Sequence, residues 1–150
     1  MTRFPLLTAA LAAFAAGPAL AAEDDITRVA STYSVTETAD RLAAAAEENG
    51  ATAFARVDHG AGARGVGSDI GESELLIFGN PQAGTPVMVE NRLAGLMLPL
   101  KVLVYEDAEG QVWLAYEDLA DRLDDLDGVN DATAAPLMGA LRNLTEGAAN

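Results

Sequence analysis

Residues 101–116, KVLVYEDAEGQVWLAY, predict an antiparallel β-hairpin. The first five and last six residues of this stretch are rich in valine, leucine and aromatic residues, which are typical of strands. Between them, segment 107–110 (DAEG) has the composition of a tight turn. Successive side chains of a strand point to opposite faces, so one face of the hairpin should meet helices. Trp113 and Ala115 share one face, and Val112, Leu114 and Tyr116 share the other. Whichever face does not meet the helices is expected to be an interface or a partly exposed surface.

Further strands and helices are predicted on both sides of this hairpin. Strands are predicted at 27–33, 52–58 and 73–78. Helices are predicted at 34–49, 85–93, 117–126 and 133–145. The segment 59–71 holds five glycines and is predicted to be a loop, with a loop that contains one helical turn as the alternative. This order predicts an α+β, two-layer, β-α-β(4)-α fold, in which helices pack on one face of a mostly antiparallel sheet.

Composition excludes several classes of site. The chain has 150 residues, 50% of them hydrophobic, which is the material of one domain with one core. It has no cysteine and one histidine, so disulfides, thiolate metal sites, cysteine nucleophiles and multi-histidine metal cages are excluded. The formal net charge of −14 argues against a nucleic-acid partner, because phosphate binding needs clustered lysine and arginine.

The N-terminus has the pattern of an export signal. A basic start at Arg3 precedes an apolar run, and residues 19–21 (ALA) form a small-residue cleavage site. An uncleaved membrane anchor is the alternative, but the run is only about 13 residues long and Gly17-Pro18 breaks it. We therefore expect a signal peptide at 1–21 and a single domain at 22–150, without membrane contact after cleavage. The expected location is the periplasm or the exterior of a bacterial cell.

Five segments carry a resemblance to a known family. They are SVTETADRL (34–42), ARVDH (55–59), LLIFGNPQAGTPVM (75–88), LPLKVLVYED (98–107) and GQVWLAY (110–116). In this order and spacing the chain resembles the domain of unknown function 302 family, over a core of about 27–120 with a C-terminal helical extension at 121–150. The resemblance implies the β-α-β(4)-α fold and implies no activity. The glycine-rich stretch 60–67 departs from the family pattern, so no ordered helix is expected directly after His59.

Asp58 and His59 are the first candidate site residues. Histidine titrates near neutral pH and can act as acid, base or ligand, and a carboxylate can orient its ring. The pair stands where a predicted strand meets a glycine-rich stretch, a common place for functional residues. The alternative is structural, with Asp58 capping the following turn and His59 bonded to a loop carbonyl.

The segment 79–85, GNPQAGT, is the second candidate. Gly79, Asn80, Pro81, Gly84 and Thr85 are predicted to bind a ligand, because backbone amides in such a loop can hold an anion or a polar group. The segment lacks the Gly-Lys-Ser/Thr ending of a P-loop. The alternative is a tight strand-to-helix connection, with Thr85 at the cap of the helix.

Two other motifs do not support a site. Segment 60–65 (GAGARG) matches GxGxxG, but later glycines disfavour the helix that a dinucleotide site needs. In the acidic run 124–131, an EF-hand register would place Leu123 and Ala134 at positions that require oxygen ligands. We therefore expect no metal and no cofactor.

The leading hypothesis is an uncharacterised exported domain without enzymatic activity. It would bind a small molecule or a protein between the Asp58-His59 strand end and segment 79–85, possibly as a homodimer. The first alternative is a hydrolase or isomerase with His59 as acid or base, although no GxSxG motif or second histidine is present. The second alternative is a structural or interaction protein of the cell envelope.

Overall fold

A five-stranded antiparallel sheet forms the centre of the fold. The computed structural model describes residues 25–150, and the predicted signal peptide lies outside them. The strand order is β1-β5-β4-β3-β2, and every neighbouring pair is antiparallel. The strands are β1 (Ile26–Ser31), β2 (Thr52–Asp58), β3 (Ser73–Gly79), β4 (Leu100–Glu106) and β5 (Val112–Glu117).

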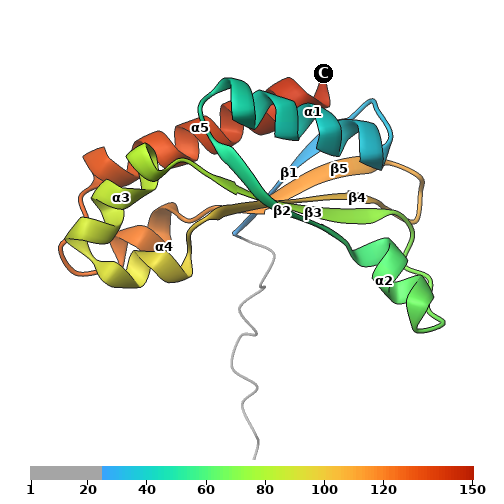
Figure 1. Ribbon diagram of the computed structural model, residues 1–150, viewed down its shortest axis with the longest axis horizontal. Coiled ribbons are helices and arrows are strands. Elements are labelled where there is room, and N and C mark those ends of the chain that lie inside the picture. The colour runs from blue at the N-terminus through green and yellow to red at the C-terminus, as the bar shows by residue number, and fades with distance from the viewer. Residues whose placement is uncertain (1–24) are drawn as a thin grey trace, which may run out of the picture.

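Two long helices cover one face of this sheet. The helices are α1 (Val35–Glu48), α2 (His59–Gly65), α3 (Pro81–Glu90), the 3₁₀ helix η1 (Arg92–Leu96), α4 (Ala120–Asp124) and α5 (Asp131–Ala149). Helices α1 and α5 lie side by side over the same face, whereas α2 lies at one end of the sheet and α3 and α4 at the other (Figure 1). The predicted α+β two-layer architecture is confirmed.

The core lies between this sheet face and the two long helices. Alternate strand residues point toward the helices, and burying a large aliphatic or aromatic side chain contributes roughly 1.5–3 kcal/mol. The largest fully buried apolar side chains are Leu42, Leu76, Phe78, Val87, Val102, Val104, Leu114, Leu123, Leu141 and Val35. The hydroxyls of Ser31 and Thr38 are also buried there and share a hydrogen bond of 2.8 Å, so neither polar group lacks a partner.

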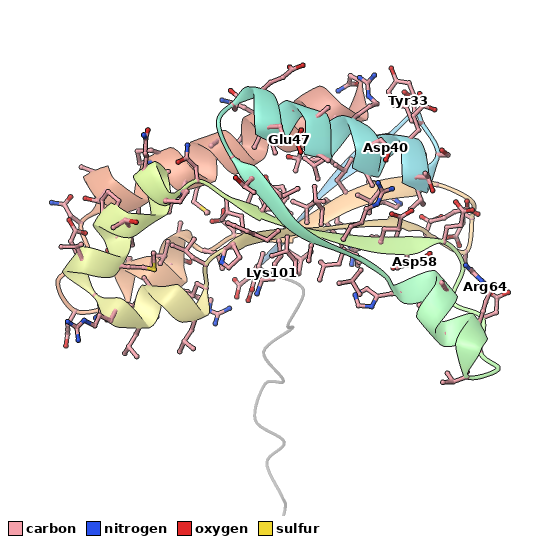
Figure 2. All side chains as sticks on the ribbon, in the orientation of Figure 1. Tyr33, Asp40, Glu47, Asp58, Arg64 and Lys101 are labelled. Atoms are coloured by element: carbon pink, nitrogen blue, oxygen red, sulfur yellow. The ribbon has the colours of Figure 1, made fainter. Side chains whose placement is uncertain are left out.

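The opposite face of the sheet is not covered by α1 or α5. Leu75, Leu103, Tyr105 and Trp113 point to this side and remain half-buried. Lys101 lies on the same side, below the sheet and away from the residues Asp40 and Glu47 of α1 (Figure 2). The prediction that one hairpin face stays partly exposed is therefore confirmed.

Two local predictions were wrong. Segment 59–65 is the helix α2, because the Asp58 carboxylate accepts a hydrogen bond from the Ala61 amide and so begins the helix despite its glycines. Helix α3 begins at Pro81 and not near Thr85, because Asn80 caps it and proline is favoured at the first helical position. Thr85 is thus inside the helix.

Candidate functional site

The two predicted site segments lie at opposite ends of the strand pair β2–β3. In this antiparallel register, Asp58 is opposite Glu74 and Thr52 is opposite Gly79. Asp58 lies six residues after Thr52 along β2, which is about 20 Å at the usual rise per residue. The expectation that Asp58-His59 and segment 79–85 form one shared site is therefore wrong. Neighbouring antiparallel strands run in opposite directions, so the last residue of one strand lies beside the first residue of the other. The last residues of the two strands therefore lie at opposite ends of the pair.

At the first end, Asp58 serves as a helix cap. Its Oδ1 accepts from the backbone N–H of Ala61 at 2.6 Å, as the structural interpretation predicted. His59 is exposed, lines neither of the two pockets described below, and forms no side-chain hydrogen bond with residues 25–150. The predicted bond from His59 to a loop carbonyl is thus absent, and nothing in this region encloses the imidazole.

At the second end, the backbone amides of Gln82, Ala83 and Gly84 are already bonded. Asn80 Oδ1 accepts from the N–H of Gln82 at 2.9 Å, and its carbonyl accepts from Ala83 and Gly84 at 3.0 and 2.9 Å. Pro81 has no N–H to offer. These groups start helix α3, so the predicted cradle of amides for an anion does not form.

The same segment instead lines a pocket of about 240 Å³, here named the β3–α3 pocket. It lies between the end of β3, helix α3, the segment before β4, and α5. All five site residues predicted in segment 79–85 contribute to it. Its lining consists of Phe54, Gly79, Asn80, Pro81, Gly84, Thr85, Met88, Leu98, Pro99, Leu100 and Leu137. Most of these side chains are apolar, so the pocket is suited to an apolar body with few polar contacts.

Two glycines bring the walls of the pocket close together. A Cβ added at Gly84 would lie 3.3 Å from Leu98 Cδ1, and one at Gly79 would lie 3.3 Å from both Phe54 Cε2 and Pro99 Cβ. Side chains at these positions would push their neighbours, which themselves line the pocket. The absence of side chains at Gly79 and Gly84 therefore sets the width of the pocket.

Phe54 is a pocket residue that the sequence patterns did not predict. The β2–β3 register shifts between Ala53 and Ala55, and the extra residue of this irregularity is Phe54. Its side chain remains 57% exposed at the pocket. The sequence contained a signal for this role, since Phe54 is a large aromatic residue among mostly small and polar residues of an edge strand. Strand alternation alone does not reveal a bulge.

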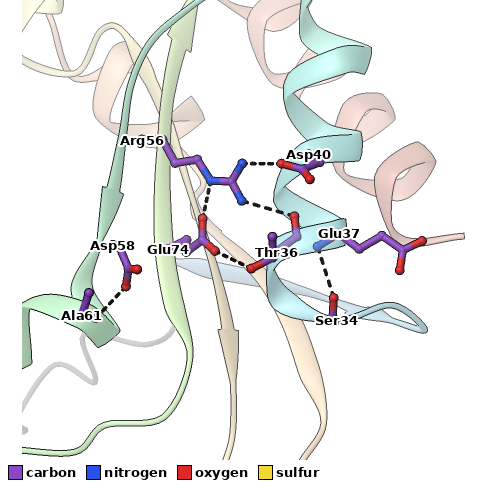
Figure 3. A network of polar contacts seen from close by, with 8 residues as sticks. All are labelled: Ser34, Thr36, Glu37, Asp40, Arg56, Asp58, Ala61 and Glu74. Carbon is purple, nitrogen blue, oxygen red and sulfur yellow. Dashed lines mark hydrogen bonds and ion pairs between the residues drawn. The ribbon is translucent and has the colours of Figure 1, made fainter. Parts of the chain in front are cut away.

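A polar network fixes β2 against β3 and α1 (Figure 3). The Arg56 guanidinium donates to Glu74 and Asp40, and also to the Thr36 carbonyl at 3.2 Å. Thr36 Oγ1 donates to Glu74 Oε1 at 2.9 Å. The hydrogen bond to Glu74 is the largest cause that raises the pKa of Arg56 above its ordinary value. This network positions the edge strand that carries Phe54.

The described residues 25–150 contain no group of three or more histidine and carboxylate side chains that could hold a metal ion. Two carboxylates do interact at the start of α5, where the hydrogen bond and charge of Asp131 raise the pKa of Asp124. None of the helices within this range combines the length and apolar content that a bilayer crossing requires.

Curated relatives share part of the chain. A stretch of 98 residues, 65% of this chain, is 47% identical to part of fluoride-specific ion channel FluC 1 of Brucella suis biovar 1 (strain 1330), where it covers 39% of the channel. The channel of the same name from Brucella abortus biovar 1 (strain 9-941) is also 47% identical over 98 residues, which are 36% of its length. The chain thus spans well under half the length of these relatives.

A solved structure and a family model agree on the fold and the family. The crystal structure of an uncharacterized conserved protein DUF302 from Bacillus stearothermophilus superimposes with a TM-score of 0.73, at 22% identity, over 83% of this chain and 98% of that one. The family model described as "Domain of unknown function DUF302" matches residues 27–144 and so reaches well into α5, beyond the expected core of 27–120. Since this match covers most of the sequence, the chain belongs to the DUF302 family.

Proposed function

We propose that this protein is an exported binding domain that takes a small, uncharged, largely apolar molecule in the β3–α3 pocket. The observation that carries the proposal is the convergence of all five predicted residues of segment 79–85 on one mainly apolar pocket. Binding sites are typically concave and apolar, with a few polar groups that orient the ligand.

The volume and lining of the pocket define the class of ligand. An engineered apolar cavity of about 150 Å³ is known to hold benzene, so about 240 Å³ suits a bicyclic ring or a short branched chain. The side chain of Thr85 forms no hydrogen bond with the described residues, and the side-chain Nδ2 of Asn80 also forms none with them. These two groups can contact one polar atom of the ligand.

The charge of the protein favours an uncharged ligand. The formal net charge is −14, and neither an arginine nor a lysine lines the β3–α3 pocket. A free anion would approach against a negative potential and would meet no cation at the pocket.

Binding is favoured over catalysis because the chain's sole histidine is remote from the pocket. His59 follows the far end of β2 and is exposed. The pocket lining has no histidine, carboxylate or lysine that could serve as a general acid or base. The hydrolase or isomerase alternative thus has no support from this geometry.

The proposal is tested by titrating the mature protein with N-phenyl-1-naphthylamine, a neutral apolar probe whose fluorescence rises on binding. We expect saturable binding that Gly84→Ala weakens, because the new methyl lies 3.3 Å from Leu98 Cδ1 and occupies space between two residues that line the pocket. Phe54→Ala removes an exposed wall and should also weaken it. Gly139→Ala in α5 is the matched control, since a Cβ there meets nothing within 4 Å. Equal affinity in all four proteins would reject the pocket as the site.

The curated relatives suggest a second candidate function. In them, a stretch 47% identical to this chain is part of a fluoride-specific ion channel. Domains joined in one chain often act in one process, so we infer that this domain assists fluoride export by a separate channel. Deleting its gene should then increase the sensitivity of the cells to fluoride. Unchanged growth in fluoride would exclude this role.

A further inference from the structure

We propose that the uncovered face of the sheet is the interface of a twofold homodimer. This open face consists of the strand side chains that point away from α1 and α5. Its members are Ile26, Arg28, Ala30, Ala55, Val57, Ser73, Leu75, Ile77, Lys101, Leu103, Tyr105, Trp113, Ala115 and Glu117. The proposal concerns assembly and is independent of the ligand proposed for the β3–α3 pocket.

The strand registers align the open face in rows across the sheet. The central row runs from Ala115 through Leu103 and Leu75 to Val57. Leu75 and Leu103 are half-buried and Val57 is 39% exposed, so an apolar strip extends over three neighbouring strands. Contiguous apolar surface of this kind on a small domain marks an interaction site.

The charge distribution favours a second copy of the chain on this face. The protein carries 23 acidic and 9 basic residues, so two copies repel each other over most of their surface. On the open face, Glu117 is the single acidic side chain, whereas Lys101 and Arg28 are basic. Charge repulsion between two copies is therefore weaker over this face than over the protein surface as a whole.

The face is also complementary to itself. A twofold axis parallel to the strands and between β4 and β5 places β4 of one copy over β5 of the other. Leu103 then faces the small Ala115 of the partner subunit, because the two residues are directly paired within each sheet. Lys101 lies two residues from Leu103 on β4, and Glu117 lies two residues from Ala115 on β5. Lys101 therefore faces the carboxylate of the partner subunit's Glu117. Isologous interfaces require such reciprocal pairs, large with small and positive with negative.

Existing contacts allow these groups to be buried. Trp113 already donates its indole N–H to Asp107 at 2.7 Å, so covering the ring leaves no polar atom without a partner. Glu117 forms an ion pair through Oε1 with Arg122, and a carboxylate can accept from a second cation through its other oxygen. Leu75, Leu103 and Ala115 line a hollow of about 540 Å³, which side chains of the second copy would fill.

Analytical ultracentrifugation of the mature protein tests the assembly. We expect a dimer at micromolar concentration, and Leu103→Asp should weaken it by roughly tenfold or more, because the change buries a charge at the centre of the interface. Leu96→Asp is the matched control, since Leu96 is 80% exposed on η1 and outside the open face. Circular dichroism confirms that both variants fold. A monomeric wild type, or equal dissociation of the two variants, would overturn the proposal.

Thiol cross-linking with a short bis-maleimide tests the position of the axis, since the chain has no native cysteine. Sheets packed face to face lie about 10 Å apart, which is too far for a direct disulfide but within reach of this reagent. Leu103→Cys protein mixed with Ala115→Cys protein should form the mixed cross-linked dimer in preference to either homodimer. Ala44→Cys, on the exposed side of α1, is the control and should stay unlinked in the mixture. Predominant cross-linked homodimers, or equal linking of the control, would contradict this arrangement of the two copies.

Discussion

The indole nitrogen of Trp113 on β5 donates a hydrogen bond of 2.7 Å to Oδ2 of Asp107 in the β4–β5 turn. The other carboxylate oxygen of Asp107 accepts from the backbone N–H groups of Glu109 and Gln111, at 3.0 and 2.8 Å. One aspartate thus joins the turn to the open face of the sheet. The hairpin that defines the fold is closed by this side chain.

These hydrogen bonds, first that from Trp113 and then that from Gln111, lower the pKa of Asp107 below its ordinary value of 3.8. A depressed pKa in the folded state stabilises the protein above the unfolded pKa, and this contribution is lost as the pH falls through the folded pKa. We expect Asp107→Asn to lower the urea midpoint at neutral pH and to reduce the loss of stability below about pH 4. Trp113 fluorescence reports both transitions.

Glu109→Gln is the control for this experiment, because it removes a negative charge from the same turn without removing a side-chain bond. If both substitutions change the pH profile equally, the hydrogen bonds of Asp107 are not the cause.

The capping role of Asp58 predicts a contrast with its neighbour. Asp58→Ala should lower the free energy of unfolding by about 1 kcal/mol, because it removes the bond to the Ala61 amide. His59→Ala should change it by less than about 0.5 kcal/mol, since the imidazole is exposed and unbonded. Urea unfolding measures both. A larger loss for the histidine variant would show that the imidazole makes a stabilising contact in the folded protein.

Arg56 and Glu74 predict a measurable coupling between β2 and β3. The Glu74 side chain is 13% exposed, so Arg56→Ala leaves a largely buried carboxylate without its cation and should cost about 1–2 kcal/mol. Asp40→Ala should cost less than about 0.5 kcal/mol, because the Asp40 side chain is 64% exposed and solvent screens its pair with Arg56. A double-mutant cycle on Arg56 and Glu74 gives the coupling. A value near zero would contradict the network.

The proposed export predicts the mass of the mature protein. Cleavage after Ala21 should leave a chain that begins at Ala22. Intact-mass spectrometry of the protein from a periplasmic extract measures this start. A full-length protein found with the membrane fraction would support the uncleaved anchor instead.

Much of the fold was predictable because the strands and long helices have clear local patterns. The hairpin residues KVLVY and QVWLAY form β4 and β5, and the capping box at Ser34 begins α1, with Ser34 accepting from the Glu37 amide. The shorter elements were less predictable. Helix α2 forms from a glycine-rich segment because a single cap at Asp58 and its packing on β3 outweigh weak intrinsic propensity.

The candidate site was predictable only in part. The residue types of segment 79–85 indicated a functional segment, and these residues do converge on the β3–α3 pocket. Their relation to Asp58 could not be predicted without the pairing of β2 with β3, which places the two ends apart. Phe54 reaches the pocket because of the irregularity in β2, and Leu137 reaches it because α5 packs against residues far away in the sequence. Local sequence patterns predict neither feature.

Native mass spectrometry of the protein purified from its own cellular compartment is the most direct test for a ligand in the β3–α3 pocket. We expect wild-type protein and Gly139→Ala to retain a small, uncharged, apolar molecule, and Gly84→Ala to retain much less of it. The same bound mass at equal occupancy in all three proteins, or no bound molecule in any of them, would contradict a ligand in the β3–α3 pocket.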